Sequence, residues 1–129
     1  PVKLFYELEP GLTILWAHAG MSEPAHVVGA MLDTYKTLYA DTSYRENDIL
    51  MGDGTIDPGW MAVIKRHSDR LMIGSDTWVN EQWDSYEELI DLNRQWLSKL
   101  PRPMAERIAY KNAAKLFRRS VSRTLIGKR

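Results

Sequence analysis

The sequence predicts an α/β fold built on a short parallel sheet, and two observations lead to this prediction. First, the apolar runs at 12–17 and 71–74 are typical of strands buried on both faces, and 38–43 is a third strand candidate. Second, amphipathic segments of helical spacing separate these runs along the chain. Alternation of strand and helix favours parallel strands joined by helices.

Both apolar runs end in an ionisable residue. The run 71–74 is followed by Asp76, and the run 12–17 is followed by His18. An unpaired buried carboxylate is costly, so we expect Asp76 to have a partner, which could be a metal ion, a histidine or an arginine. If the two strands lie parallel in one sheet, His18 and Asp76 emerge on the same rim.

The helices are predicted from apolar spacing and from start and stop signals. Asp57 before Pro58 is typical of a capped helix start, and Ser85 with Glu88 predicts a capping box. The polar stretch 44–55 is predicted to be a loop. Helices are expected over 2–8, from Pro24 to Tyr35, from Pro58 toward Asp69, from Tyr86 toward Pro101, and over 104–119.

Composition narrows the class of protein. The 129 residues suit one domain, and 17 basic residues balance 17 acidic ones, so no overall field attracts a membrane or nucleic acid. A basic stretch from Lys115 to the end leaves nucleic-acid binding as a weaker alternative, although solvated helix ends have this composition more often. The chain has no cysteine, no long apolar span and no signal peptide, which favours a cytoplasmic protein.

Four segments in order resemble a known family. They are WAHAG at 16–20, YADTSYR at 39–45, DRLMIGSDTW at 69–78 and RIAYKNAAKLF at 107–117. Together they are similar to the carboxy-terminal part of the amidohydrolase superfamily, in the amidohydrolase-related branch that also contains decarboxylases. The resemblance implies a partial TIM barrel, a single (β/α) domain over 1–129, with 12–18, 39–43 and 71–76 as strands six, seven and eight.

The resemblance also implies an active site at the carboxyl ends of the strands. Asp76 would be the strand-eight aspartate, a metal ligand that handles a proton of the attacking water. His18 would be a metal ligand or an acid/base group. We further infer that Arg45 could bind a substrate carboxylate and that Trp78 could wall a substrate pocket, although packing suits Trp78 equally well.

Part of the family pattern is missing. The three histidines, at 18, 26 and 67, include no His-x-His pair. The complete enzyme is expected to use a divalent metal, with zinc as the first candidate, on a small carbonyl or carboxylate substrate; this chain alone is expected to bind none and to be inactive. Because the sequence starts at Pro1, the chain could be a fragment or a truncated product.

Three barrel strands leave bare edges, so a homo-oligomer that completes or covers the barrel is expected. The alternative function is a non-catalytic assembly or interaction domain derived from such a barrel. Among the remaining residues, Asp41 could project into the barrel or pair with Arg45. His26 and His67 are expected to be surface or packing residues, with the helix dipole favouring the cation at His67.

Overall fold

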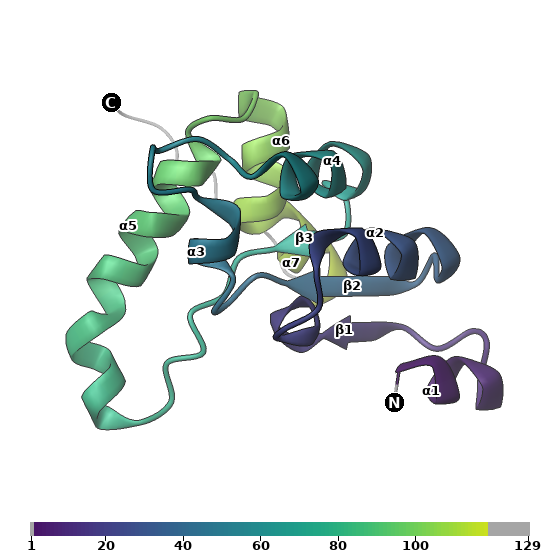
Figure 1. The fold of residues 1–129 in the computed structure, drawn as a ribbon. Helices are drawn as coiled ribbons and strands as arrows, with labels where there is room; N and C mark the ends of the chain where they lie inside the picture. The colour runs from purple at the N-terminus through teal and green to yellow at the C-terminus, as the bar shows by residue number, and fades with distance from the viewer. Residues whose placement is uncertain (1, 119–129) are drawn as a thin grey trace.

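A computed structural model of the chain describes residues 2–118. Helices and short strands alternate from α1 to β3, and helices make up the rest (Figure 1). The last three elements follow one another without a break and are called the C-terminal helix below. In chain order the elements are α1 (Val2–Leu8), β1 (Ile14–Trp16), the 3₁₀ helix η1 (Ala17–Gly20), α2 (Ala25–Thr34), β2 (Leu38–Asp41), α3 (Glu46–Ile49), α4 (Pro58–His67), β3 (Leu71–Met72), the 3₁₀ helix η2 (Asn80–Ser85), α5 (Tyr86–Leu97), α6 (Arg102–Glu106), the π-helical turn η3 (Arg107–Lys111) and α7 (Asn112–Leu116).

The three strands form one parallel sheet in the order β1-β2-β3. Ile14 pairs with Leu38, and Ala40 pairs with Leu71. The predicted α/β class and parallel strand direction are therefore confirmed. The sheet is open, as expected for part of a barrel, and all three strands end at the same rim (Figure 1).

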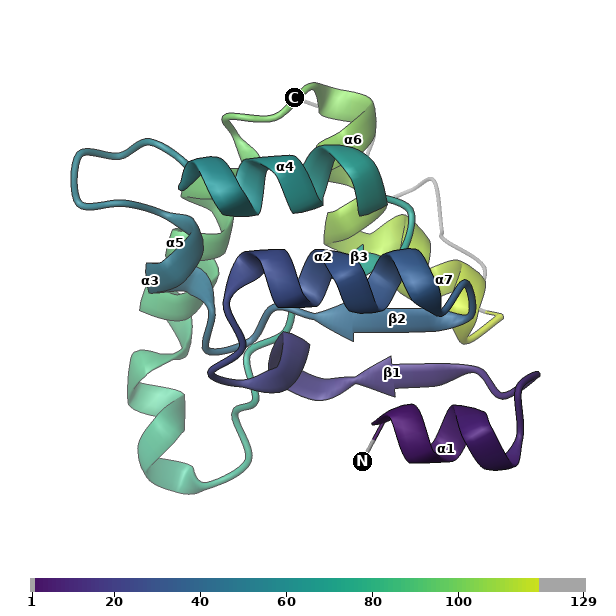
Figure 2. The same ribbon diagram turned by 45° about the vertical axis from the view of Figure 1, so that its right-hand side comes forward.

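Burial differs between the two faces of the sheet. Leu38 and Ala40 of β2 are fully buried, whereas Tyr39 and Asp41 are only partly covered. Helices α2 and α4 lie together on one side of the strands (Figure 2). Burial on both faces was the expectation for the strands, and it holds for β3 but is wrong for β1, where Leu15 remains 39% exposed.

The C-terminal helix covers the outer edge of β3. The carbonyls of Arg70 and Met72 accept hydrogen bonds from β2, so the intervening Leu71 turns its polar groups outward. The Asn112 amide donates to the Leu71 carbonyl at 2.6 Å and to the Ser68 carbonyl at 2.8 Å. The Ile73 amide donates to the Ile108 carbonyl at 3.3 Å. The outward Leu71 carbonyl and the Ile73 amide therefore have hydrogen-bond partners within the chain.

Only some of the helix ends match those predicted from the sequence. Asp57 caps α4 by accepting from the Trp60 amide at 2.9 Å, as predicted. The capping box at Ser85 is wrong: the Ser85 side chain makes no capping bond, because η2 runs directly into α5 and leaves no free helix start. The predicted loop 44–55 contains the short helix α3.

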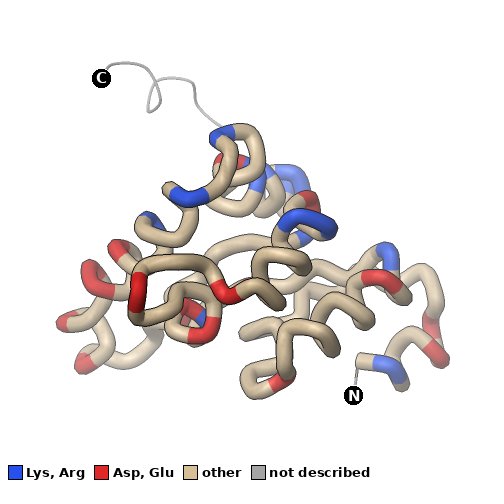
Figure 3. The backbone as a smooth tube through the Cα atoms, turned by 45° about the horizontal axis from the view of Figure 1, so that its top comes forward, with Lys and Arg blue, Asp and Glu red and all other residues tan. Residues whose placement is uncertain are grey.

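Acidic residues gather along η2 and α5, where Glu81, Asp84, Glu87, Glu88 and Asp91 follow one another without a basic residue (Figure 3). Lys115 and Arg118 belong to the basic stretch considered for nucleic-acid binding, and its other members lie outside the described residues. Within residues 2–118, no helix has the length and apolar character needed to cross a membrane.

Replacement of Asn112 tests the covering of β3. Asn112→Ala should lower the free energy of unfolding by on the order of 2 kcal/mol, because two buried carbonyls lose their donor. Urea unfolding monitored by tryptophan fluorescence measures the change. Lys115→Ala, at an exposed position of α7, is the matched control and should leave stability nearly unchanged. Equal stability of the two variants would contradict the role of Asn112 as the donor to the Ser68 and Leu71 carbonyls.

Candidate functional site

The ends of β1 and β3 bring His18 and Asp76 together. His18 follows β1 within η1, and Asp76 follows β3 after a short extended segment. His18 Nε2 lies 3.7 Å from Asp76 Oδ2, with the two side chains 17% and 38% exposed. The partner of Asp76 is thus a histidine, one of the three kinds expected. The separation is too long for a direct hydrogen bond, which leaves both groups open to a third atom.

Left-handed backbone marks the same rim. His18, Tyr44 and Asp76 have φ angles of 57°, 61° and 50°, and each follows a different strand. Residues other than glycine adopt this region at a cost, and such residues gather at functional sites where the surroundings hold them. The strand ends therefore combine left-handed backbone, which is common at functional sites, with the side chains of His18 and Asp76.

The segment after β2 surrounds the His18 ring. Ser43 Oγ lies 3.0 Å from His18 Nδ1, and the Ser43 carbonyl oxygen lies 3.3 Å from the same nitrogen. The Tyr44 ring lies against the imidazole with 5.5 Å between centroids. Ser43 Oγ also donates a hydrogen bond to Asp41. Sequence reasoning did not identify Ser43, although its position as the last residue of the strand candidate 38–43 was a usable signal.

Arg45 is placed differently from the expectation that it binds a substrate carboxylate. Its guanidinium is buried and donates to the carbonyls of His18 at 3.3 Å, Ala19 at 3.2 Å and Glu23 at 2.7 Å. Its Nε pairs with Asp48 at 2.7 Å, so the possible pairing of Asp41 with Arg45 is replaced by this ion pair. The arginine therefore holds the loop that carries His18.

Trp78 lies in the segment after Asp76, and its side chain is 75% exposed. The backbone amides of Trp78 and Val79 donate to Gln82 Oε1, at 2.9 and 3.3 Å. Gln82 Nε2 donates in turn to the Tyr44 hydroxyl at 2.9 Å. The loop after β3 is thereby tied to the rim through Gln82, while the Trp78 indole faces solvent.

A buried carboxyl lies behind the rim, at the start of α3. Glu46 is 2% exposed and accepts from Asn93 Nδ2 of α5 at 3.1 Å. Burial raises the pKa of Glu46 above its usual value, and the negative charge of Asp41 adds to this, while hydrogen bonds from Asn93 and the backbone oppose it. Glu46 thus connects the loop after β2 to α5.

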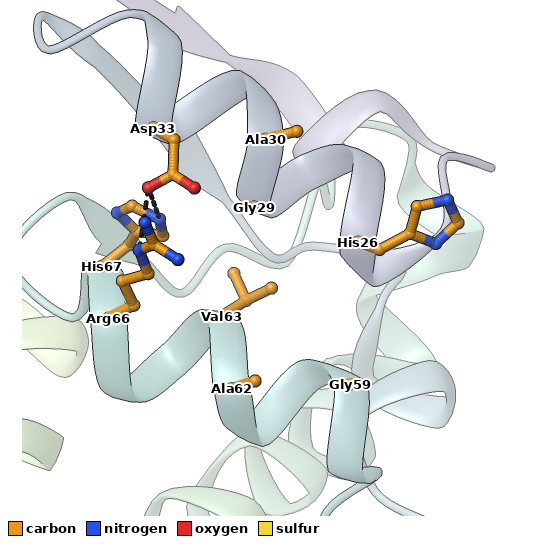
Figure 4. Close-up of a pocket in the computed structure, with 9 residues that line it drawn as sticks. All are labelled: His26, Gly29, Ala30, Asp33, Gly59, Ala62, Val63, Arg66 and His67. Carbon is orange, nitrogen blue, oxygen red and sulfur yellow. Dashed lines mark ion pairs between the residues drawn. The ribbon is translucent and has the colours of Figure 1, made fainter.

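A hollow of about 280 Å³ lies on the outer helical layer, between α2 and α4 (Figure 4). Gly29 and Gly59 let these helices approach closely, since a Cβ at either would lie 3.3 Å from a side chain of the other helix. His26 lies at one end of the residues that line the hollow, and His67 turns toward Asp33 at the other end (Figure 4). The hollow therefore belongs to helix packing and lies apart from the rim residues.

The surroundings of His67 contradict the expectation that the helix dipole favours its protonated form. It is buried, with Nδ1 2.9 Å from Arg70 Nη2 and Nε2 3.2 Å from Asp33 Oδ1, the latter not aligned as a hydrogen bond. Burial lowers the pKa of His67, and the positive charge of Arg70 lowers it further. The negative charge of Asp33 opposes this, but the net shift of the pKa is downward, so the neutral ring is favoured over the cation that the dipole argument predicted.

The rim does not fit a complete metal centre. A catalytic zinc takes three protein ligands and a water. In the part of the chain that the structure describes, no group of three or more histidine, aspartate or glutamate side chains is placed to hold an ion. His18 Nε2 and Asp76 Oδ2 offer two candidate ligand atoms.

Comparison with known proteins gives one match. A family model described as amidohydrolase matches residues 6–119, which includes all three strands and the C-terminal helix. No curated protein and no solved structure matches the chain.

Proposed function

The chain belongs to the amidohydrolase family, and from this premise we propose that its rim is part of a hydrolase active site in which His18 and Asp76 are the proton-handling groups. The observation that carries the proposal is the approach of His18 Nε2 to Asp76 Oδ2 across the ends of parallel strands. The substrate class is a small carbonyl or carboxylate compound, as the family membership favours.

The chemistry follows from the two groups. When water attacks a carbonyl carbon, it must lose a proton, and the leaving group must gain one. One of the two groups, imidazole or carboxylate, can accept the proton that the water loses. The leaving group can then take that proton from the same group, or from the other group after the proton has passed between them. Their side chains are 17% and 38% exposed, so a bound molecule could reach both.

The other groups that a complete active site needs would lie outside the described residues. Members of this family typically use divalent metal ions, which polarise the attacked bond. The rim supplies two of the ligands such an ion needs, so we propose that this chain is inactive alone. Further strands, from additional sequence or from a second chain, would complete the site.

Zinc titration tests the role of the rim pair. No bound metal is expected in the isolated chain, but zinc added in excess should bind weakly at the rim, because two protein ligands cannot fix the ion as three do. Isothermal titration calorimetry should show a binding heat that is lost in His18→Gln and in Asp76→Asn. His26→Gln, at an exposed histidine on α2, is the control and should retain it. Absence of any zinc binding, or binding that survives both rim substitutions, would contradict the proposal.

The open edge of the sheet favours the assembly alternative. The C-terminal helix satisfies β3, but no strand pairs with the outer side of β1 within residues 2–118. Leu15 on β1 and Leu12 just before it are 39% and 38% exposed, and Leu4, Phe5 and Leu8 of α1 are more exposed still. A bare edge next to apolar side chains favours pairing with another chain. We propose a second copy of this chain as that partner.

Sedimentation velocity tests this assembly. The chain should sediment as a dimer or larger species, and Leu15→Lys should shift it toward monomer, because a charge on β1 opposes strand pairing. Lys65→Glu, on the exposed side of α4, is the control and should leave the assembly intact. If the unmodified chain stays monomeric at high concentration, the proposed self-assembly is contradicted.

A further inference from the structure

One carboxylate oxygen organises the rim. Asp41 Oδ1 accepts hydrogen bonds from the Ser43 hydroxyl, from the Ser43 amide at 3.1 Å and from the His18 amide at 3.2 Å. These donors come from the segments after two different strands, β1 and β2. The carboxylate therefore fixes both the backbone of His18 and the hydroxyl that contacts the His18 ring.

The direction of these hydrogen bonds determines where the imidazole proton lies. A serine hydroxyl has a single proton, and Ser43 donates it to Asp41, because a carboxylate only accepts. Ser43 Oγ can then only accept from His18 Nδ1, which lies 3.0 Å away. The other neighbour of Nδ1, the Ser43 carbonyl at 3.3 Å, is also an acceptor. Both neighbours require a proton on Nδ1.

We propose that Asp41 and Ser43 are positioning residues that hold neutral His18 in the Nδ1–H tautomer, with the Nε2 lone pair directed toward Asp76. The significance of this tautomer for catalysis rests on the proposed function, whereas the tautomer itself does not. A lone pair on Nε2 can accept a proton from a bound water or bind a metal. In the opposite tautomer, Nε2–H would face the Asp76 carboxylate and Nδ1 would face two acceptors.

The surrounding contacts also fix the backbone position from which the His18 ring projects. His18 has φ 57° and ψ 20°, and its amide is held by Asp41 while its carbonyl is held by Arg45. The same backbone group is thus fixed at both ends.

Gly74 provides the space that the Asp41–Ser43 pair occupies. A Cβ at this position would lie 3.2 Å from both Ser43 Cβ and Ser43 Oγ, and 3.3 Å from Asp41 Oδ1. These distances are tighter than ordinary van der Waals contact, so Ser43 or Asp41 would have to move. Gly74 precedes Asp76 by two residues, so the segment after β3 contacts the positioning pair and also carries the second rim group.

Nitrogen NMR of the imidazole tests the proposal. In the ¹⁵N-labelled full chain, at a pH where the ring is neutral, His18 Nδ1 should have the shift of a protonated ring nitrogen and Nε2 that of an unprotonated one. In Ser43→Ala the nearer of the two acceptors at Nδ1 is lost, while the backbone carbonyl of residue 43, at 3.3 Å, remains. The Nε2 resonance should therefore move part of the way toward the protonated value. Ser43→Thr, which keeps the hydroxyl, should restore the original pattern, and Gly74→Ala should give a partial shift in the direction of Ser43→Ala.

Ser22→Ala is the matched control, because Ser22 is an exposed serine near the same loop. It should leave both His18 shifts unchanged. A protonated Nε2 in the unmodified chain would overturn the proposal, and so would a tautomer that is the same in a folded Ser43→Ala variant. The Nδ1–H tautomer together with a failed zinc titration would keep this inference while rejecting the proposed function.

Discussion

The rim depends on holding consecutive left-handed residues at the end of β1. His18 and Ala19 both have positive φ, and each such residue costs on the order of 1–3 kcal/mol unless its surroundings impose it. Two charged side chains from the segment around the end of β2 impose it here. Asp41 accepts the His18 amide, and the buried Arg45 guanidinium donates to the carbonyls of His18 and Ala19. Without these contacts, the imidazole has no fixed position relative to Asp76.

The two edges of the sheet have different environments, and this difference determines which edge is open to another chain. At β3, Asn112 and the carbonyl of Ile108 serve the outward polar groups that a neighbouring strand would otherwise serve. At β1, the apolar Leu15 remains partly exposed. The chain therefore protects one edge with its own C-terminal helix and presents the other, so that any additional strand has one place to pair within the described residues.

Sequence reasoning could reach the parts of the site that depend on local pattern. His18 and Asp76 each follow an apolar run, and parallel strands place such residues on one rim whatever the details of packing. The cap at Asp57 is equally local, since the capping carboxylate and the Trp60 amide that donates to it are three residues apart. The small sheet and its strand direction followed from the alternation of elements.

The rest required contacts between distant segments. Arg45 resembled a rim residue, but its partners at 18, 19 and 23 lie more than twenty positions away, and only the folded loop brings their carbonyls together. The role of Ser43 likewise exists only once β1 and β2 pair. The last helix was expected to span 104–119, yet within the described residues it ends at Leu116, and Phe117 beyond it is 58% exposed.

The convergence of His18 and Asp76 is tested most directly by cross-linking, which the absence of cysteine from the chain makes possible. A variant carrying His18→Cys and Asp76→Cys should form an intramolecular bridge with a short thiol-reactive cross-linker, detected by intact mass and peptide mapping. The pair Lys36→Cys and Asp76→Cys, with Lys36 at the opposite end of β2, should not. A bridge in the second pair but not the first would contradict a shared rim.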